Sequence, residues 1–177
     1  MRAMLFDSET NGLVENHSMK LTYQPEIIEF YGCIADLKTG EIEREVDSLV
    51  RPSGNIPDKI ISVTGITEIM LAEAPTFKDL APTIIDLIEE APMAIAHNAS
   101  FDQELVNIEL ERIGRIVHWP RLLCTVEQTV HLLGVRLSLS NLHQHLFGEL
   151  PAHVHRAKAD TMTLLRCCVK LHEDGVL

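Results

Sequence analysis

The sequence lacks any apolar run that could cross a membrane. A spanning helix needs about 18 to 20 successive apolar residues, and no stretch of the chain approaches that length. The first residues also lack the apolar region of a signal peptide, because acids appear by position 7. Nine glycines and eight prolines are too few for a low-complexity chain. These absences predict a globular cytoplasmic protein that has no membrane partner.

Cysteine is scarce, and its four positions contain no CxxC pair. Cys33 and Cys124 stand alone, whereas Cys167 and Cys168 are neighbours in a strongly helical stretch. The sequence therefore predicts reduced and mostly buried thiols, as expected in a cytosolic protein.

Basic residues are outnumbered, with 15 lysines and arginines against 26 acids and a net charge of −11. A protein that grips long duplex DNA through phosphate contacts usually has the opposite sign. The charge therefore argues against a sequence-specific DNA-binding protein. It leaves room for an enzyme whose carboxylates hold metal ions, since each divalent ion reverses the local charge.

The length of 177 residues fits one domain, which we expect to span residues 1–177. A turn signal at residues 38–40 separates two strand-like runs and predicts a hairpin. After the hairpin, strands and helices alternate, which predicts a mixed sheet with helices on its faces. The predicted strands are residues 2–7, 27–37, 41–50, 93–97 and 121–125, and the predicted helices are 76–90, 100–113, 126–133, 140–147 and 156–172.

Two pairs of residues resemble capping boxes, which satisfy free backbone groups at a helix start. Thr76 with Asp79 predicts the start of one helix, and Ser100 with Gln103 predicts the start of another. The segments between elements, residues 11–26 and 51–67, are rich in polar and turn-forming residues and are expected to be irregular.

Asp7 and Glu9 lie two positions apart at the end of the first predicted strand. Alternate residues of a strand point to the same face, so both carboxylates should point the same way. Two like charges side by side repel, and a cation between them would relieve this repulsion. The alternative is a pair of solvated loop acids.

Two more acids, Asp102 and Asp160, lie in the first turns of predicted helices. Asp102 falls in the first turn of a predicted helix, directly after a buried strand, where an acid also complements the helix dipole. Asp160 borders the apolar stripe of the last helix and should face the sheet. His155, five residues earlier, can lean over the same place.

Four acids from three segments could thus meet at one point. Two divalent ions would balance their four charges and clamp a phosphodiester during in-line displacement. Ligation by carboxylates alone favours Mg²⁺ or Mn²⁺ over zinc. A single histidine beside them would act as the general base on water.

Three motifs, in order along the chain, resemble those of the DnaQ-like (DEDDh) 3′–5′ exonucleases. They are residues 6–12 (FDSETNG), 97–102 (HNASFD) and 155–160 (HRAKAD), and residues 63–67 (VTGIT) also resemble the family. The resemblance spans nearly the whole chain. It implies an α/β RNase H-like three-layer fold, with a mixed central sheet that begins with an antiparallel hairpin and carries helices on both faces.

The resemblance also implies roles for single residues. Metal ligands would be Asp7, Glu9, Asp102 and Asp160, with His155 as the base. Substrate contacts would come from Thr10, Asn98 and Phe101, although the sequence pattern itself favours a core position for Phe101. The implied substrate is a nucleic acid with a free 3′ end, expected to be single-stranded DNA, and the implied products are nucleoside 5′-monophosphates. A polymerase or another replication protein is a candidate partner.

Three alternatives stay open at this stage. One is an exoribonuclease of the same family that trims RNA 3′ ends, since the choice between DNA and RNA depends on contacts to the 2′-hydroxyl. Another is a non-catalytic exonuclease-like module that binds nucleic acid or a protein. The third is a zinc site among the cluster of His143, His145, His153 and His155, whose spacing is unlike that of common zinc motifs.

Overall fold

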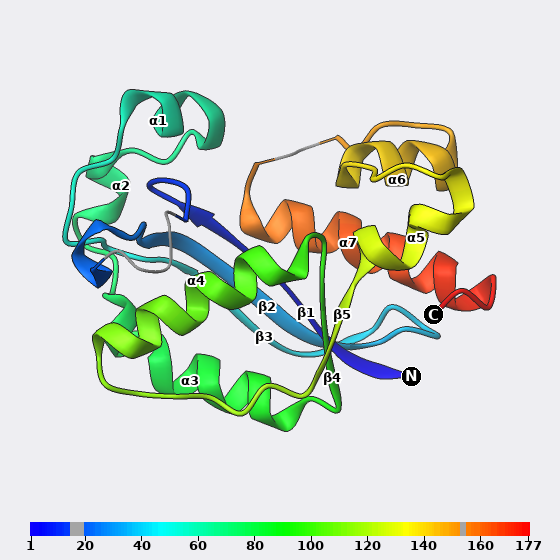
Figure 1. Ribbon diagram of the computed structural model, residues 1–177, viewed down its shortest axis with the longest axis horizontal. Helices are drawn as coiled ribbons and strands as arrows, with labels where there is room; N and C mark the ends of the chain where they lie inside the picture. The colour runs from blue at the N-terminus through cyan, green and yellow to red at the C-terminus, as the bar shows by residue number, and fades with distance from the viewer. Residues whose placement is uncertain (15–19, 153–154) are drawn as a thin grey trace.

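The computed structural model describes residues 1–14, 20–152 and 155–177 and is built on a five-stranded sheet with the order β3-β2-β1-β4-β5 (Figure 1). β1 pairs antiparallel with β2, and it pairs parallel with β4 on its other side. The mixed sheet with a hairpin start, predicted from the sequence, is confirmed. The strands are β1 (Arg2–Thr10), β2 (Ile27–Asp36), β3 (Ile42–Leu49), β4 (Met93–Ala96) and β5 (Arg121–Cys124).

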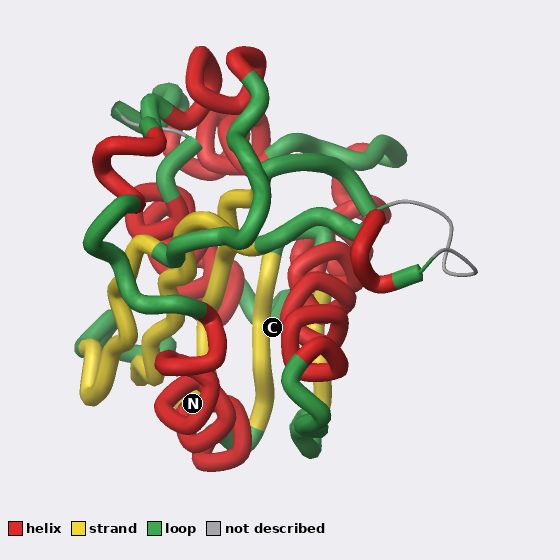
Figure 2. The backbone as a smooth tube through the Cα atoms, turned by 90° about the vertical axis from the view of Figure 1, so that its left-hand side faces the viewer, coloured by secondary structure: helices red, strands yellow, loops and turns green. Residues whose placement is uncertain are grey.

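Helices cover both faces of this sheet, as the view in Figure 2 shows. α3 and α4 pack on one face, while α7 packs on the other and is itself covered by α6. The predicted three-layer architecture is therefore confirmed. The helices are α1 (Asp58–Thr64), α2 (Glu68–Leu71), α3 (Phe77–Glu90), α4 (Ala99–Arg112), α5 (Thr125–Leu133), α6 (Leu139–Phe147) and α7 (Ala157–Glu173), with a short 3-10 helix η1 (Leu21–Tyr23).

The alternation of β1 decides which layer each of its side chains meets. Met4 and Phe6 lie in the core beneath α3 and α4, whereas Ala3 and Leu5 lie in the core beneath α7. Further along the strand, odd-numbered positions therefore face α7 and even-numbered positions face α4. This rule places the polar residues at the end of β1.

The structure differs from the sequence prediction in two segments. β1 continues to Thr10, three residues beyond the predicted end at position 7, because pairing with β2 extends to Thr10. The segment 51–67, expected to be irregular, contains α1 and leads into α2. α1 ends at Gly65, whose φ of 70° is a left-handed conformation that favours glycine.

The two capping predictions have different outcomes. The capping box of Thr76 and Asp79 is present at the start of α3. The prediction for Ser100 and Gln103 is wrong, because α4 begins earlier, after Asn98. Asn98 has a left-handed backbone with φ 73° and provides no side-chain cap.

The four cysteines are unpaired, and three of them are buried while Cys124 is partly buried. The predicted buried thiols are confirmed. Among the described residues, no helix is both long enough and apolar enough to span a membrane.

Candidate active site

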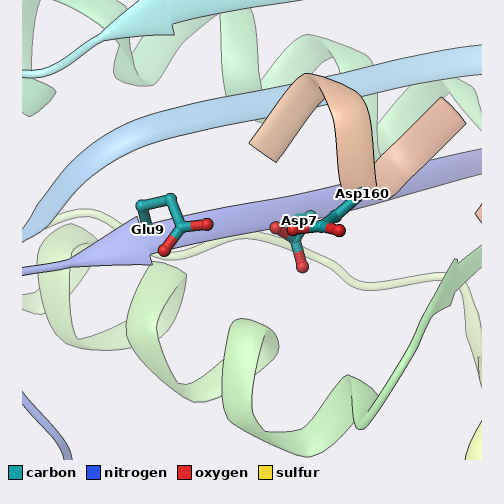
Figure 3. Close-up of side chains that lie close together, drawn as sticks. All are labelled: Asp7, Glu9 and Asp160. Carbon is teal, nitrogen blue, oxygen red and sulfur yellow. The ribbon is translucent and has the colours of Figure 1, made fainter. Parts of the chain in front are cut away.

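Three carboxylates meet where β1 passes the first turns of α7. Asp7 and Glu9 come from β1 and Asp160 comes from α7, and one oxygen of each lies within 4.8 Å of the others. Figure 3 shows the three side chains directed toward a common space. Asp7 and Glu9 share a face because they are two positions apart in an extended strand. The shared face was predicted from the sequence, and the structure shows that it is the face covered by α7.

Asp102 reaches the same region from α4, on the other layer of the fold. Asp102 is only 3% exposed. Its Oδ1 accepts hydrogen bonds from the backbone N–H of Ser8 at 3.1 Å and from the hydroxyl of Ser8 at 2.7 Å. The charge of Asp102 raises the pKa of Asp7, though burial of Asp7 has the larger effect. Asp102 thus lies beside the three-acid cluster rather than inside it.

The pKa values of all four acids, Asp7, Glu9, Asp102 and Asp160, are raised, so each resists ionisation. Burial, followed by repulsion from the neighbouring carboxylates, raises the pKa of Asp7 well above its ordinary value and that of Glu9 to about 7. Burial also raises the pKa of Asp102 to about 7, against the hydrogen bonds from Ser8, and it raises the pKa of Asp160. Cations between these groups would remove the repulsion. A donor set of carboxylate oxygens fits hard divalent ions, so the residues suit the metal that the family implies.

His155 lies at the start of the turn that leads into α7. Its backbone has a φ of 61°, a left-handed conformation that is uncommon for residues other than glycine. Its backbone N–H donates to Oδ2 of Asp160 at 2.7 Å, and the side chain is exposed. The turn therefore ties the candidate base to a candidate ligand. The role of His155 as the base stays a prediction.

Glu29 is a buried acid near the site that sequence reasoning missed. It lies on β2 directly opposite Glu9. Its carboxylate accepts hydrogen bonds from Nε and Nη2 of Arg156, the latter at 2.6 Å, and from the backbone N–H of Ala157 at 2.9 Å. This ion pair fastens the N-terminus of α7 to the sheet. The alternation of β2 would not reveal it, because every residue of β2 except the last is buried.

Of the three predicted substrate residues, Thr10 ends β1, while Asn98 and Phe101 belong to the start of α4. The hydroxyl of Thr10 donates to the backbone oxygen of Gly12 at 2.6 Å, at the end of β1. Asn98 is exposed at the start of α4. Phe101 is partly buried against the core beneath α3 and α4, in agreement with the sequence pattern. Contact of these residues with substrate stays a prediction.

The zinc alternative gains no support from the described residues, where the one group of at least three potential ligands is Asp7, Glu9 and Asp160. The imidazole of His143 instead bonds the backbone oxygen of Glu149 and Nη1 of Arg166. His153 lies outside the described residues.

An exonuclease family model, RNase_T, matches residues 4–167 of the chain. Among curated proteins, the chain is 31% identical over 159 residues to the PolC-type DNA polymerase III of Clostridium perfringens and 28% identical over 170 residues to that of Staphylococcus haemolyticus. These matches cover 89% and 95% of this chain but only 10% and 11% of the polymerases. The chain therefore spans about a tenth of the length of these relatives.

Solved structures show the same fold. The nuclease domain of 3′hExo, a DEDDh family member bound to rAMP, superposes with a TM-score of 0.79 at 21% identity, over 98% of this chain and 92% of that one. Exonuclease X in complex with 5′-overhanging duplex DNA gives a TM-score of 0.70 at 24% identity, over 98% and 93%. The chain therefore belongs to the exonuclease family, and its identification from the sequence as a DnaQ-like 3′–5′ exonuclease with an RNase H-like fold is confirmed at the level of family and fold.

Proposed function

We propose that residues 1–177 form a single exonuclease domain that removes nucleotides one at a time from a 3′ end and releases nucleoside 5′-monophosphates. The meeting of Asp7, Glu9 and Asp160 within 4.8 Å, with buried Asp102 beside them, is the observation that carries this proposal. Such crowding of carboxylates destabilises a protein unless cations occupy the space between them.

The four acids would hold two Mg²⁺ or Mn²⁺ ions, which suit oxygen ligands. When bound, such ions polarise a phosphodiester and lower the pKa of water. One oxygen of Asp7 lies within 4.8 Å of Glu9 and Asp160, and the charge of Asp102 also acts on Asp7. These four carboxylates would therefore hold the ions jointly.

His155 would accept the proton of the attacking water. Its side chain is exposed next to Asp160, so it can reach a water molecule at the edge of the cluster. As the water oxygen bonds to phosphorus, the bond to the 3′ oxygen would break, and that oxygen would take a proton from solvent to become the new 3′-hydroxyl. From its exposed turn, His155 would pass the proton of the water on to solvent.

Substrate contacts would be few and local, because a net charge of −11 leaves little basic surface for long duplexes. Thr10 at the end of β1, with Asn98 and Phe101 at the start of α4, would contact the terminal nucleotides. Contacts of this kind read the end of a strand rather than its sequence.

Single-stranded DNA 3′ ends are the favoured substrate, since the curated relatives are DNA polymerases. The same relatives make a polymerase or replication protein a candidate partner. RNA 3′ ends are the second candidate, favoured by a neighbour described as a 3′-exonuclease that recognises a histone mRNA stem-loop.

The test is incubation of the chain with single-stranded DNA, duplex DNA and RNA, each labelled internally, with Mg²⁺, Mn²⁺ or EDTA. We expect 5′-monophosphates from at least one substrate with metal and none with EDTA. Faster release from RNA than from DNA would favour the second candidate. Tight binding without cleavage on all three substrates would instead indicate a non-catalytic module.

A further inference from the structure

Ser8 stands between two candidate metal ligands on β1, but its side chain faces the other way. Asp7 and Glu9 face α7, whereas Ser8 belongs to the even-numbered positions that face α4. Ser8 is 8% exposed, so its hydroxyl is buried and needs a partner. That partner is Asp102 at 2.7 Å.

The candidate centre thus draws its acids from two layers of the fold. Asp7, Glu9 and Asp160 lie on the side of α7, and Asp102 comes from α4 on the opposite layer. Because the centre includes acids on both sides of β1, α4 must keep a fixed position against this strand. Among the described residues, Ser8 donates both hydrogen bonds that tie the Asp102 carboxylate to β1.

The geometry of these two hydrogen bonds restricts the orientation of the Asp102 carboxylate. Oδ1 of Asp102 accepts the backbone N–H and the hydroxyl of the same residue, at 3.1 and 2.7 Å. Two donors on one oxygen oppose rotation of the carboxylate plane, so Oδ2 keeps one direction. The backbone donor is present with any residue at position 8 other than proline, but the hydroxyl donor depends on the side chain.

We propose that Ser8 is a positioning residue whose hydroxyl orients Asp102 for metal binding. The proposal rests on the proposed function, because it takes Asp102 as a metal ligand. Loss of a hydrogen bond that orients a metal ligand typically costs 10- to 100-fold in metal affinity or activity. The hydroxyl of Ser8 should therefore matter for metal affinity and for the catalytic rate rather than for nucleic-acid binding.

Ser8→Thr and Ser8→Val make a matched pair, since both are β-branched and of similar size but only threonine has the hydroxyl. We expect Ser8→Thr to bind Mn²⁺ like the wild type in isothermal titration calorimetry. Ser8→Val should bind it about 10- to 100-fold more weakly. At saturating metal, kcat of Ser8→Val should fall while KM for the nucleic acid stays the same.

A second comparison tests whether the effect passes through Asp102. In an Asp102→Ala background, replacing Ser8 by valine should cause no further loss of Mn²⁺ affinity. Equal Mn²⁺ affinity and kcat in Ser8→Thr and Ser8→Val would overturn the proposal. If Ser8→Val fails to fold, Ser8→Ala replaces it, and wild-type affinity in that variant would overturn the proposal in the same way.

The proposed function fails separately. If the wild type neither binds Mn²⁺ nor degrades nucleic acid, the metal centre itself is wrong. If the wild type does both and Ser8→Val behaves as Ser8→Thr does, only the role of Ser8 is wrong.

Discussion

Asp7 is the residue on which the electrostatics of the site converge. Burial, and then the charges of Asp102, Asp160, Glu9 and Glu29, raise its pKa well above the ordinary value. A group held under such repulsion lowers the stability of the metal-free protein whenever it is ionised. The same group becomes a ligand when a cation is present. Function and stability therefore make opposite demands at this position.

Asp7→Asn should separate these two demands. We expect activity to fall by at least about 100-fold, the scale for loss of a key electrostatic group. In EDTA, however, the variant should melt at least about 2 °C above the wild type, since relief of about 1 kcal/mol shifts a domain of this size by that amount.

Calorimetric melting in EDTA and nuclease assays with Mg²⁺ check both parts of this prediction. Glu111→Gln, at an exposed acid on α4, is the control and should change neither quantity. A lower melting temperature for Asp7→Asn than for the wild type in EDTA would contradict the repulsion between Asp7 and the neighbouring carboxylates.

His155→Ala should slow cleavage by about 10²- to 10⁴-fold, the range for a positioned general base. Metal affinity should stay nearly intact, since His155 lies outside the three-acid cluster. Rates per folded molecule at saturating Mg²⁺ check this. An unchanged rate would reduce His155 to a structural part of the turn before α7.

The sequence predicts some residues of the site well and others not at all. Asp7 and Glu9 follow from strand alternation, and Asp160 follows from its place beside the apolar stripe of α7. Glu29 could not be predicted as a site residue, because its partner Arg156 is 127 positions away and no local sequence pattern indicates a pairing over that distance. The hydrogen bond from the hydroxyl of Ser8 could not be predicted for the same reason, since Asp102 is 94 positions away.

At the level of elements, the pair of Glu29 and Arg156 fixes where α7 begins. Glu29 is 5% exposed as a side chain, and Arg156 is 43% exposed. Arg156→Met would leave a buried carboxylate with no cation, which costs about 3 kcal/mol of unfolding free energy.

Arg44→Met supplies the matched control for this pair. Arg44 on β3 pairs with Glu90 at 2.6 Å, but both side chains are more than a third exposed. Loss of an exposed pair costs less than about 1 kcal/mol. Urea unfolding with bound metal absent compares the two variants. Equal losses would show that the buried pair stabilises the fold no more than an exposed pair does.

Most elements, including the four-residue strands β4 and β5, were predictable to within a few residues, but α1 and α2 were not. α1 and α2 have seven and four residues, too short for a helical period to stand out from a polar segment. The end of β1 was missed because Ser8 to Thr10 are polar, and only their pairing with β2 makes them a strand. Pairing with a distant strand thus outweighs local polarity at the end of β1, where the candidate metal ligands lie.

For the whole molecule, the raised acid pKa values make stability depend on pH and on metal together. Glu9 has a pKa of about 7 in the folded protein against an ordinary 4.5, and Asp102 has about 7 against 3.8. The folded state therefore binds more protons than the unfolded state between about pH 4 and 7. This contribution to stability is lost as the pH rises through that window.

We expect the metal-free protein to melt at a lower temperature at pH 8 than at pH 5. Saturating Mg²⁺ at pH 8 should restore much of the loss, because a cation replaces the missing protons. In Asp7→Asn, the difference between the two pH values should be smaller. Melting curves at both pH values, in EDTA and in Mg²⁺, test this. A metal-free protein that is more stable at pH 8 would contradict the assigned direction of the pKa shifts.

The central claim is that this cluster of acids removes nucleotides from a 3′ end. The most direct measurement offers the protein the same single strand in linear and circular form, with Mg²⁺ present, and identifies the products by mass. The linear strand should yield nucleoside 5′-monophosphates and a ladder shortened from the 3′ end, and the circle should stay intact. Asp7→Asn should leave both forms intact. Internal fragments from the circle, or undiminished cleavage by Asp7→Asn, would contradict the claim.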